Sequence, residues 1–295
     1  MKVLRSNILG FCMGVRAAVK ISYALPTKSL NKVYTLGHLI HNPRVLEELK
    51  NRGIEVLDIK TAEDLPLDLS GSAVIIRAHG VAPNLERAIC ERGGRIVDAT
   101  CPRVKKSQLI AQDFENNGFQ LFIAGESGHA EIAGLAGYAP SCIIIGNTAE
   151  AEIAAKNLYE SNSSANPQVK TALIAQTTID EHEYREIGQV ILKYFPTLEI
   201  IQTICPATTE RQNSLRELLK KVDAVIIAGG KESANTRRLS LIAAESEKPY
   251  VLAESVSDIP KEFTAYNTIG LCAGASTPDS LIDEIEEKLK EPNNA

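Results

Sequence analysis

The chain has 295 residues, enough for about two domains, and its 44% hydrophobic and 23% charged residues are ordinary for a soluble globular protein. Acidic residues (37) outnumber basic ones (32), and this net charge of −5 argues against non-specific nucleic-acid binding, which needs a basic surface. No apolar run approaches the roughly 20 residues that cross a bilayer, and no secretory signal opens the chain. We therefore expect a cytoplasmic protein with no membrane partner, whose six cysteines form no disulfides.

Short apolar, β-branched runs alternate with helical patterns along the chain. Near-continuous apolar runs of this length predict parallel strands buried on both faces, and their alternation with helices predicts βαβ units. Most runs end in Gly, Ser, Thr or His, at the carboxyl ends where open α/β sheets bind ligands. In chain order, the expected strands cover residues 73–80, 95–101, 120–125, 142–146, 172–178, 224–230 and 268–276.

A threefold repeat emerges when three cysteines are taken as origins. Cys12, Cys101 and Cys205 each follow a short apolar run and precede a helical segment. The next strand ends in a glycine 24 or 25 residues after each cysteine, and a polar residue stands 28 or 29 residues after the same cysteine. Chance explains one matching offset easily but three aligned sets poorly. The glycines are Gly37, Gly125 and Gly229, and the polar residues are His41, His129 and Ser233.

The repeat predicts the fold class. We expect three similar α/β domains of about 95 residues, each with a mostly parallel sheet, in a pseudo-threefold trefoil around a central cluster site. The third repeat lacks a fourth cysteine, but the N-terminal segment has the character of the missing strand, so the chain can close on itself. The expected parts are an N-terminal strand in 1–12, domains over 13–101, 102–203 and 204–290, and a tail over 291–295.

Three cysteines at equivalent positions would meet at the centre of such a trefoil. Each begins a helix, whose dipole and free amides favour the thiolate that binds metals. Thiolates select zinc, copper(I) or iron–sulfur clusters, and the chain has no CxxC pair of the kind common in structural zinc sites. Three thiolates leave one iron of a [4Fe–4S] cluster open, which favours a catalytic cluster. Cys90, Cys142 and Cys272 lie outside the repeat and are expected to be buried as small hydrophobes.

Polar side chains at the strand ends form a second signal. Histidine, serine, threonine and asparagine make a donor-rich site that suits phosphate oxygens, while no Walker A or GxGxxG motif indicates a nucleotide. Glu131 is either a proton donor whose pKa is raised by burial or an exposed residue at a helix N-terminus. His182, in a charged helical stretch, is expected on the surface. The strand-end set comprises His41, Asn42, His79, His129, Glu131, Thr177, Ser233, Asn235 and Ser276.

Motifs along nearly the whole chain resemble the 4-hydroxy-3-methylbut-2-enyl diphosphate reductase family, which ends the methylerythritol phosphate route to isoprenoids. As a set, in this order, they are highly specific. The motifs are GFCMGV (10–15), LIHN (39–42), AHG (78–80), DATCP (98–102), GHAEIAG (128–134), AQTT (175–178), TICPATTERQ (203–212), SANTRRL (233–239) and AGAST (273–277).

The resemblance implies a site. It implies one [4Fe–4S] cluster on Cys12, Cys101 and Cys205, with Glu131 as the acid and Thr177 as the hydroxyl that places the substrate alcohol and relays a proton. The implied reaction removes the hydroxyl of an allylic diphosphate as water and yields isopentenyl and dimethylallyl diphosphate, with electrons from ferredoxin or flavodoxin. The implied diphosphate ligands are His41, His79, His129, Ser233, Asn235 and Ser276, of which His129 also counts as catalytic.

Two departures from the family pattern are visible. Ala130 stands where the family often has proline, which bears on the rigidity of the loop around Glu131. Ala234 stands where the family often has serine, which bears on one diphosphate contact.

Three alternatives stay open on the sequence alone. Quinolinate synthase also combines a threefold α/β repeat with three cluster cysteines, but it is a condensing dehydratase, so a substrate test separates the two. A cluster-based oxygen or iron sensor has no need of an anion pocket, and the donor-rich set argues against it. A zinc-binding structural protein is separated by metal analysis of anaerobically purified protein.

Overall fold

The computed structural model describes residues 1–40, 42–59, 61–162 and 169–290. His41 and the expected tail over 291–295 lie outside the described residues. The strands are β1 (Lys2–Arg5), β2 (Val33–Leu36), β3 (Ile54–Leu57), β4 (Ala73–Ile76), β5 (Arg95–Asp98), β6 (Gln120–Ala124), β7 (Ile143–Ile145), β8 (Thr171–Ala175), β9 (Glu199–Ile200), β10 (Ala224–Ala228), β11 (Tyr250–Ala253) and β12 (Thr268–Ala273).

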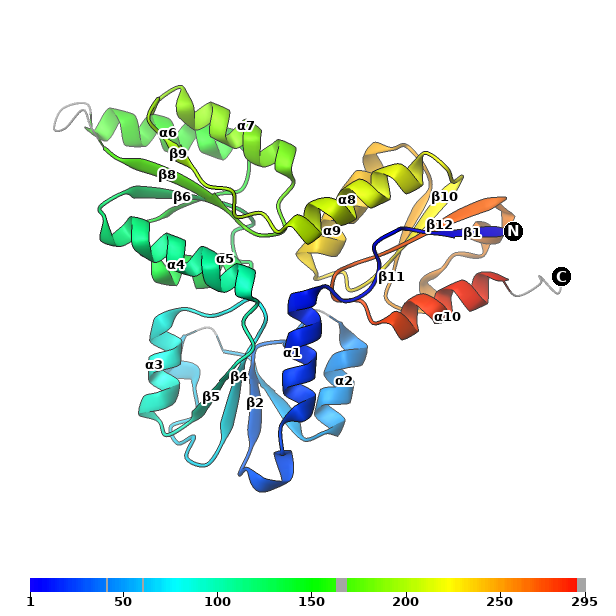
Figure 1. Ribbon diagram of the computed structural model, residues 1–295, viewed down its shortest axis with the longest axis horizontal. Coiled ribbons are helices and arrows are strands. Elements are labelled where there is room, and N and C mark those ends of the chain that lie inside the picture. The colour runs from blue at the N-terminus through cyan, green and yellow to red at the C-terminus, as the bar shows by residue number, and fades with distance from the viewer. Residues whose placement is uncertain (41, 60, 163–168, 291–295) are drawn as a thin grey trace. The chain divides into compact units, whose positions relative to one another are not determined.

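Helices connect these strands (Figure 1). Among the described residues, no helix is both long and apolar enough to cross a membrane. The α-helices are α1 (Met13–Ala24), α2 (Pro43–Asn51), α3 (Pro83–Glu91), α4 (Pro102–Asn116), α5 (Ala130–Tyr138), α6 (Thr148–Asn162), α7 (Glu181–Leu192), α8 (Pro206–Leu219), α9 (Ala234–Glu245) and α10 (Asp279–Lys290). Short 3-10 helices cover Thr27–Ser29, Ala62–Asp64, Val256–Asp258 and Lys261–Ala265.

The strands form three four-stranded sheets with one topology. Their orders are β3-β2-β4-β5, β7-β6-β8-β9 and β11-β10-β12-β1, and every pairing is parallel. These parallel sheets confirm the predicted α/β class. In the third sheet the outer place belongs to β1, which pairs with β12 so that Lys2 lies opposite Thr268. The N-terminal segment therefore supplies the strand that the third repeat lacks.

The chain divides into two compact units. Unit 1 comprises Met1–Ala24, His38–Gly53 and Pro206–Ala295, and holds the third sheet. Unit 2 comprises Leu25–Gly37 and Ile54–Cys205, and holds the first two sheets. Each sheet draws its inner strands from one repeat, while the domain boundaries expected from the sequence stay a prediction.

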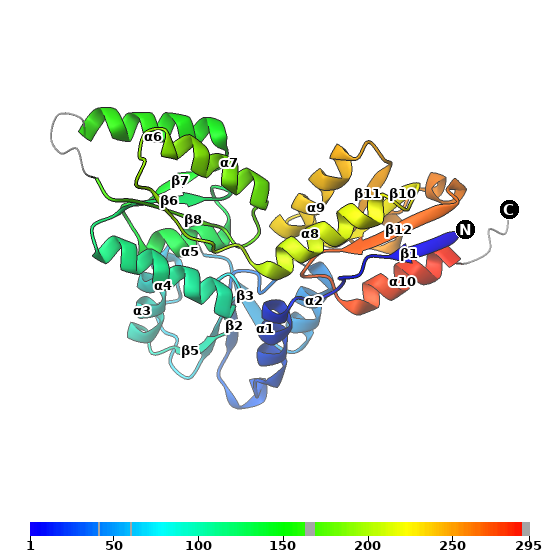
Figure 2. The same ribbon diagram turned by 45° about the horizontal axis from the view of Figure 1, so that its top comes forward.

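In unit 1, helices cover both faces of the third sheet. Along β10, Ile226 faces one side and packs with Leu281 and Ile285 of α10. Val225 and Ile227 face the other side, where α8 and α9 lie. This alternation is the two-residue period of a strand buried on both faces. Figure 2 shows α10 running beneath β1 and β12.

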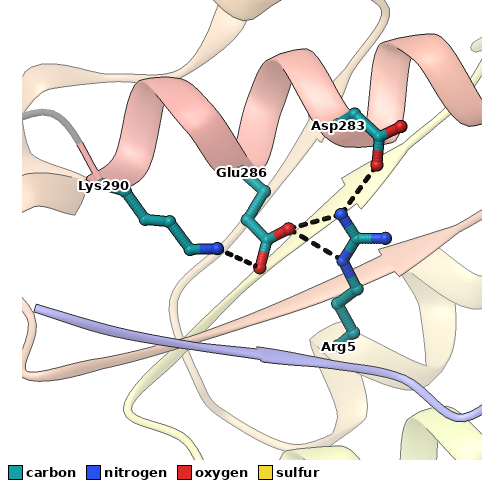
Figure 3. Close-up of polar contacts among 4 residues, drawn as sticks. All are labelled: Arg5, Asp283, Glu286 and Lys290. Carbon is teal, nitrogen blue, oxygen red and sulfur yellow. Dashed lines mark hydrogen bonds and ion pairs between the residues drawn. The ribbon is translucent and has the colours of Figure 1, made fainter.

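Charged side chains fasten β1 to α10 at the surface (Figure 3). Arg5 donates from Nη2 to Asp283 at 2.7 Å and from Nε to Glu286 at 2.9 Å. Glu286 also pairs with Lys290 at 2.9 Å. Exposed ion pairs contribute about 0–1 kcal/mol each, so their value here is to hold a strand from one end of the chain on a helix from the other.

In unit 2, the second sheet also lies between helix layers. Phe122 and Leu173 face α6 and α7, whereas Leu121 and Ile123 face α4 and α5 (Figure 2). The first sheet packs β2 and β4 against α3, where Ile89 is fully buried.

Two glycines of α5 let the segment around His79 approach that helix. A Cβ on Gly137 would lie 2.2 Å from the Cβ of Ala82, and one on Gly134 would lie 3.3 Å from Gln108 and 3.6 Å from the carbonyl oxygen of His79. Only a hydrogen fits at Gly137, so glycine there brings the carboxyl end of β4 against α5.

We predict that Gly137→Ala lowers stability. Helix propensity alone favours alanine by about 1 kcal/mol, but the added methyl meets Ala82, and overpacking costs about 1–3 kcal/mol. The free energy of unfolding in urea checks this, with Ala133→Ser, on an exposed position of the same helix, as control. A more stable Gly137→Ala variant would contradict the packing described here.

Candidate active site

Each sheet gathers predicted site residues near the carboxyl ends of its two inner strands. In the first two repeats the chain leaves these two strands for opposite edges of the sheet, which is the switch point at which α/β sheets bind ligands. In the third repeat β10 leads to β11 at one edge, while β1 from the N-terminus occupies the edge beside β12. The repeat glycines stand at this point, and each donates its N–H to the last residue of the neighbouring outer strand. The pairs are Gly37 to Leu57 (2.8 Å), Gly125 to Ile145 (2.9 Å) and Gly229 to Ala253 (2.9 Å).

Each of the three repeat cysteines makes an equivalent hydrogen bond to the end of the second inner strand of a sheet, which is β4, β8 or β12. The amide of each donates to the carbonyl oxygen two residues beyond the last residue of β4, β8 or β12. A helix begins at the residue after each cysteine. The bonds run from Cys101 to Ala78, from Cys205 to Thr177 and from Cys12 to Ala275, each at 3.0 Å.

This donor set fits an iron–sulfur cluster. Each of the three thiols is half-buried, and each stands at a helix N-terminus, where amides and dipole favour the thiolate. Cys12 belongs to unit 1, whereas Cys101 and Cys205 belong to unit 2. Within the described part of the chain, no three His, Cys, Asp or Glu side chains gather around a point that could hold a single metal ion.

The other cysteines differ in burial. Cys272 is fully buried against α8 and α9, and burial raises its pKa to about 11. Cys142 is half-buried beside the α4–α5 core. The expected burial is wrong for Cys90, which is exposed, because α3 buries Ala88 and Ile89 and the next position turns about 100° away from them.

Glu131 and Thr177 form a buried pair in the second repeat. Glu131 is 1% exposed, so the interpretation as an exposed residue of a helix N-terminus is wrong. Its Oε1 accepts from the Thr177 amide at 2.7 Å, and its Oε2 accepts from the Thr177 hydroxyl at 2.8 Å. Burial raises the pKa of Glu131 to about 7, although both Thr177 bonds favour the charged form. The pair holds a proton-exchanging carboxyl next to a hydroxyl.

Two histidines lie in the same part of unit 2. His129 is the N-cap of α5, and its Nδ1 accepts from the Glu131 amide at 3.2 Å. In the neutral ring the proton therefore lies on Nε2, which can donate. The ring of His79 meets that of His129 edge-on, with centroids 5.3 Å apart. The structure thus brings together four of the predicted site residues: His79, His129, Glu131 and Thr177.

The third repeat gathers predicted residues in unit 1. Ser233 is the N-cap of α9 and accepts from the Thr236 amide at 3.4 Å. A Cβ on Gly274 would lie 2.2 Å from the Thr236 hydroxyl oxygen, so the N-terminus of α9 meets the segment that carries Ser276. Asn235 is 4% exposed, and within the described chain neither its oxygen nor its nitrogen has a hydrogen-bond partner.

The repeat explains why the Asn235 amide is unpaired. Asn235 and Glu131 each stand two residues after a helix N-cap. Thr177 and Ala275 each stand two residues after an inner strand. Glu131 accepts from the Thr177 hydroxyl, whereas the residue equivalent to Thr177 in the third repeat is Ala275, whose side chain has no donor or acceptor. A buried amide without a partner costs about 1–3 kcal/mol, which points to a polar ligand.

One further expectation concerns a histidine away from these groups. The side chain of His182 is 73% exposed, as expected for the charged start of α7. His41 cannot be compared with its repeat equivalents, because it lies outside the described residues.

A family model described as "LytB protein" matches residues 3–290. The chain belongs to the LytB family. This match does not favour the quinolinate synthase alternative.

Full-length relatives agree with membership of the LytB family. A protein of Treponema denticola named 4-hydroxy-3-methylbut-2-enyl diphosphate reductase is 43% identical, covering 99% of this chain and 100% of the relative. One of Solidesulfovibrio magneticus with the same name is 40% identical, covering 98% and 99%. Solved structures of such reductases also match. One from Plasmodium falciparum has a TM-score of 0.87 at 26% identity, covering 99% of this chain and 89% of that one, and a second has 0.68 at 33%, covering 99% and 100%.

Sequence reasoning missed two buried residues beside these sites. Gln176 is 2% exposed; it accepts from the Glu126 amide and donates to the Thr178 hydroxyl, each at 2.9 Å, and so braces the ends of β6 and β8. Its position just before Thr177 was the available signal. Arg211 is fully buried on α8, and its helical spacing to Leu215 marked it as facing the core.

We predict that Glu131 gives stability a distinct pH dependence. Its pKa is raised from 4.5 to about 7, so between these values the folded state binds more protons than the unfolded state. Stability therefore falls as pH rises through this window and levels off above it, a loss on the order of 3 kcal/mol. Glu131→Gln should lose less stability over the same range, as measured by urea unfolding at both ends of the window.

A matched variant separates this effect from general titration. Glu126→Gln, on the loop before α5, should follow the wild-type profile. Parallel stability profiles for wild type and Glu131→Gln would show that Glu131 does not hold its proton to neutral pH.

Proposed function

We propose that this chain reduces (E)-4-hydroxy-3-methylbut-2-enyl diphosphate to isopentenyl and dimethylallyl diphosphate, the last step of the methylerythritol phosphate pathway. Membership of the LytB family and the names of full-length relatives support this substrate. The observation that carries the proposal is the buried Glu131–Thr177 pair beside His79 and His129. Loss of a hydroxyl as water needs a proton source, and an allylic diphosphate needs anion-binding donors close to that source.

The proposed cofactor is one [4Fe–4S] cluster ligated by Cys12, Cys101 and Cys205. When bound, such a cluster supplies electrons and one open iron that acts as a Lewis acid. The chain contributes three thiolates on fixed backbones, because each cysteine amide is bonded to a strand end. The proposed source of electrons is ferredoxin or flavodoxin.

Glu131 and Thr177 are proposed to deliver the proton. With a pKa of about 7, Glu131 is partly protonated at neutral pH, as suits a general acid. Protonated Glu131 donates to the Thr177 oxygen, which frees the Thr177 O–H to turn toward the alcohol of the substrate. Proton transfer then runs from carboxyl to hydroxyl to leaving group, and the burial of both residues keeps bulk water from competing.

The diphosphate is proposed to bind the neutral donors that the family resemblance implies as its ligands. Unit 2 offers His79 and His129. In His129 the Nε2 atom carries the donor proton, because Nδ1 caps α5. Unit 1 offers Ser233, Asn235 and Ser276 around the N-terminus of α9, where amides and dipole favour anions. His41, which the sequence resemblance implies as a diphosphate ligand, is proposed as a further donor.

Turnover under anaerobic conditions tests the function. The reconstituted protein should convert the allylic diphosphate to both products with a chemical reductant. Glu131→Gln should keep the brown cluster and bind substrate, but turn over roughly 10²–10⁴-fold more slowly, while Glu126→Gln stays near wild type. Failure of the wild-type protein to form either product would end the proposal, and near-normal turnover by Glu131→Gln would remove Glu131 from the acid role.

We predict that Cys101→Ser impairs the cluster and Cys90→Ser does not. A neutral hydroxyl is a poor ligand for iron compared with a thiolate, and Cys90 is an exposed thiol outside the repeat. Iron and sulfide content and the brown absorbance after reconstitution measure the difference. Equal loss in both variants, or in neither, would contradict the assignment of Cys101.

We predict that Asn235→Ala weakens binding without weakening the fold. Hydrogen bonds to charged groups are worth about 1.5–3 kcal/mol, so affinity for the diphosphate should fall about tenfold to a hundredfold. Stability should hold or rise, because the amide has no hydrogen-bond partner to lose among the residues that the structure describes. Calorimetric titration with isopentenyl diphosphate and urea unfolding measure both quantities, with the exposed Asn213→Ala as control. Unchanged affinity together with lower stability would make Asn235 structural.

A further inference from the structure

The segment that carries Cys12 is the longest of its kind. Six residues separate the end of β1 at Arg5 from Cys12. Only two separate Asp98 from Cys101, and four separate Ile200 from Cys205. A longer connection has more conformations to lose when its end is fixed. Cys12 therefore needs additional contacts to be held as firmly as the other two cysteines.

Arg211 of α8 supplies such contacts from within the core of unit 1. It is 2% exposed, and its guanidinium donates only to main-chain carbonyls in the bonds that the structure gives it. Nη1 donates to Ala273 at 2.7 Å and to Ile8 at 3.4 Å, while Nη2 donates to Gly10 at 2.9 Å. Ala273 ends β12, and the carbonyl of Ala275, two residues on, accepts from Cys12. Arg211 thus joins the Cys12 segment to the strand end on which Cys12 itself rests.

Ser214 adds a second fastening one turn along the same helix face. Its hydroxyl lies 2.6 Å from that of Ser6 and accepts from the Asn7 amide at 2.9 Å. Together, Arg211 and Ser214 contact the segment at Ser6, Asn7, Ile8 and Gly10.

The other repeats have no such arginine. Ser107 and Ala18 stand at the same distance from Cys101 and Cys12 as Arg211 does from Cys205, and the Ser107 hydroxyl bonds within its own helix, to Arg103. The arginine occurs where the N-terminal segment joins a sheet made from the other end of the chain. Among the described residues, no carboxylate lies within ion-pair distance of Arg211, and burying an unpaired cation is expensive.

We infer that Arg211 is a positioning residue which, with Ser214, fixes Ser6–Cys12 so that Cys12 is in place before any cluster binds. The link to the cluster rests on the proposed function, whereas the fixing of the segment does not. The guanidinium suits this task because its several N–H groups reach separated carbonyl oxygens at once.

Hydrogen exchange of the full chain without cluster tests the inference. In Arg211→Met, amides of residues 6–12 should exchange about tenfold faster or more, since charged hydrogen bonds are lost. Amides of 99–101 and 201–205 should be unchanged. Arg211→Lys should lie between, because one ammonium replaces fewer bonds, and Ser214→Ala should speed exchange mainly at Asn7. Arg216→Met, on the same helix, is the matched control and should match wild type.

A folded Arg211→Met variant whose amides of residues 6–12 exchange at the wild-type rate would overturn the inference. If that variant does not fold, Arg211→Lys and Ser214→Ala take its place, and loosening spread evenly over unit 1 in them would also overturn it. Reconstituted Arg211→Lys should release its cluster faster than Arg216→Met. If even the wild type takes up no cluster, the proposed function fails while the exchange pattern still judges the positioning role.

Discussion

One hydrogen bond occurs in all three repeats, from the amide of a cysteine to the carbonyl two residues beyond an inner strand. These strands are almost entirely buried. The bond ties Cys12, Cys101 and Cys205 to a segment that leaves the core, and a helix starts immediately after each cysteine. His79, Thr177 and Ser276 lie on the segments that follow these strand ends, and Glu131 at the start of α5 bonds to Thr177.

The repeats share a scaffold but not a chemistry. The position two residues after the helix N-cap carries Glu131 in the second repeat and Asn235 in the third. The position two residues after the inner strand carries Thr177 in the second repeat and Ala275 in the third. A carboxyl paired with a hydroxyl can move a proton, whereas a buried amide can bind a ligand but supplies no proton. Repeats of one sheet topology can in this way carry different polar side chains at equivalent positions.

The sequence was sufficient to predict what depends on local pattern. The positions of β4 to β8, β10 and β12 follow from apolar runs, and the equivalence of the three cysteines follows from their spacing. Burial could not be read in the same way. Glu131 was compatible with an exposed or a buried place, and only its bonds to Thr177 decide between them. Cys90 was expected inside, but the direction in which α3 faces the first sheet leaves it exposed.

Contacts between distant segments were the least predictable. Glycine is needed at position 137 only because Ala82 packs against that position and leaves no room for a Cβ atom. The helical spacing of Arg211 to Leu215 indicates the core face of α8, but it does not indicate the partners of Arg211, which include the carbonyls of Ile8 and Gly10, about two hundred residues earlier in the chain. Such pairs arise from the closure of the N-terminal strand on the third sheet, which no local pattern encodes.

Mössbauer spectroscopy of the anaerobically reconstituted protein, with iron and zinc counted on the same sample, tests the central claim most directly. If one thiolate from each repeat holds a common cluster, each chain will contain the iron and sulfide of a single [4Fe–4S] cluster, with one iron site distinct from those bound by cysteine. Stoichiometric zinc with little iron, or iron bound without sulfide, would contradict the account.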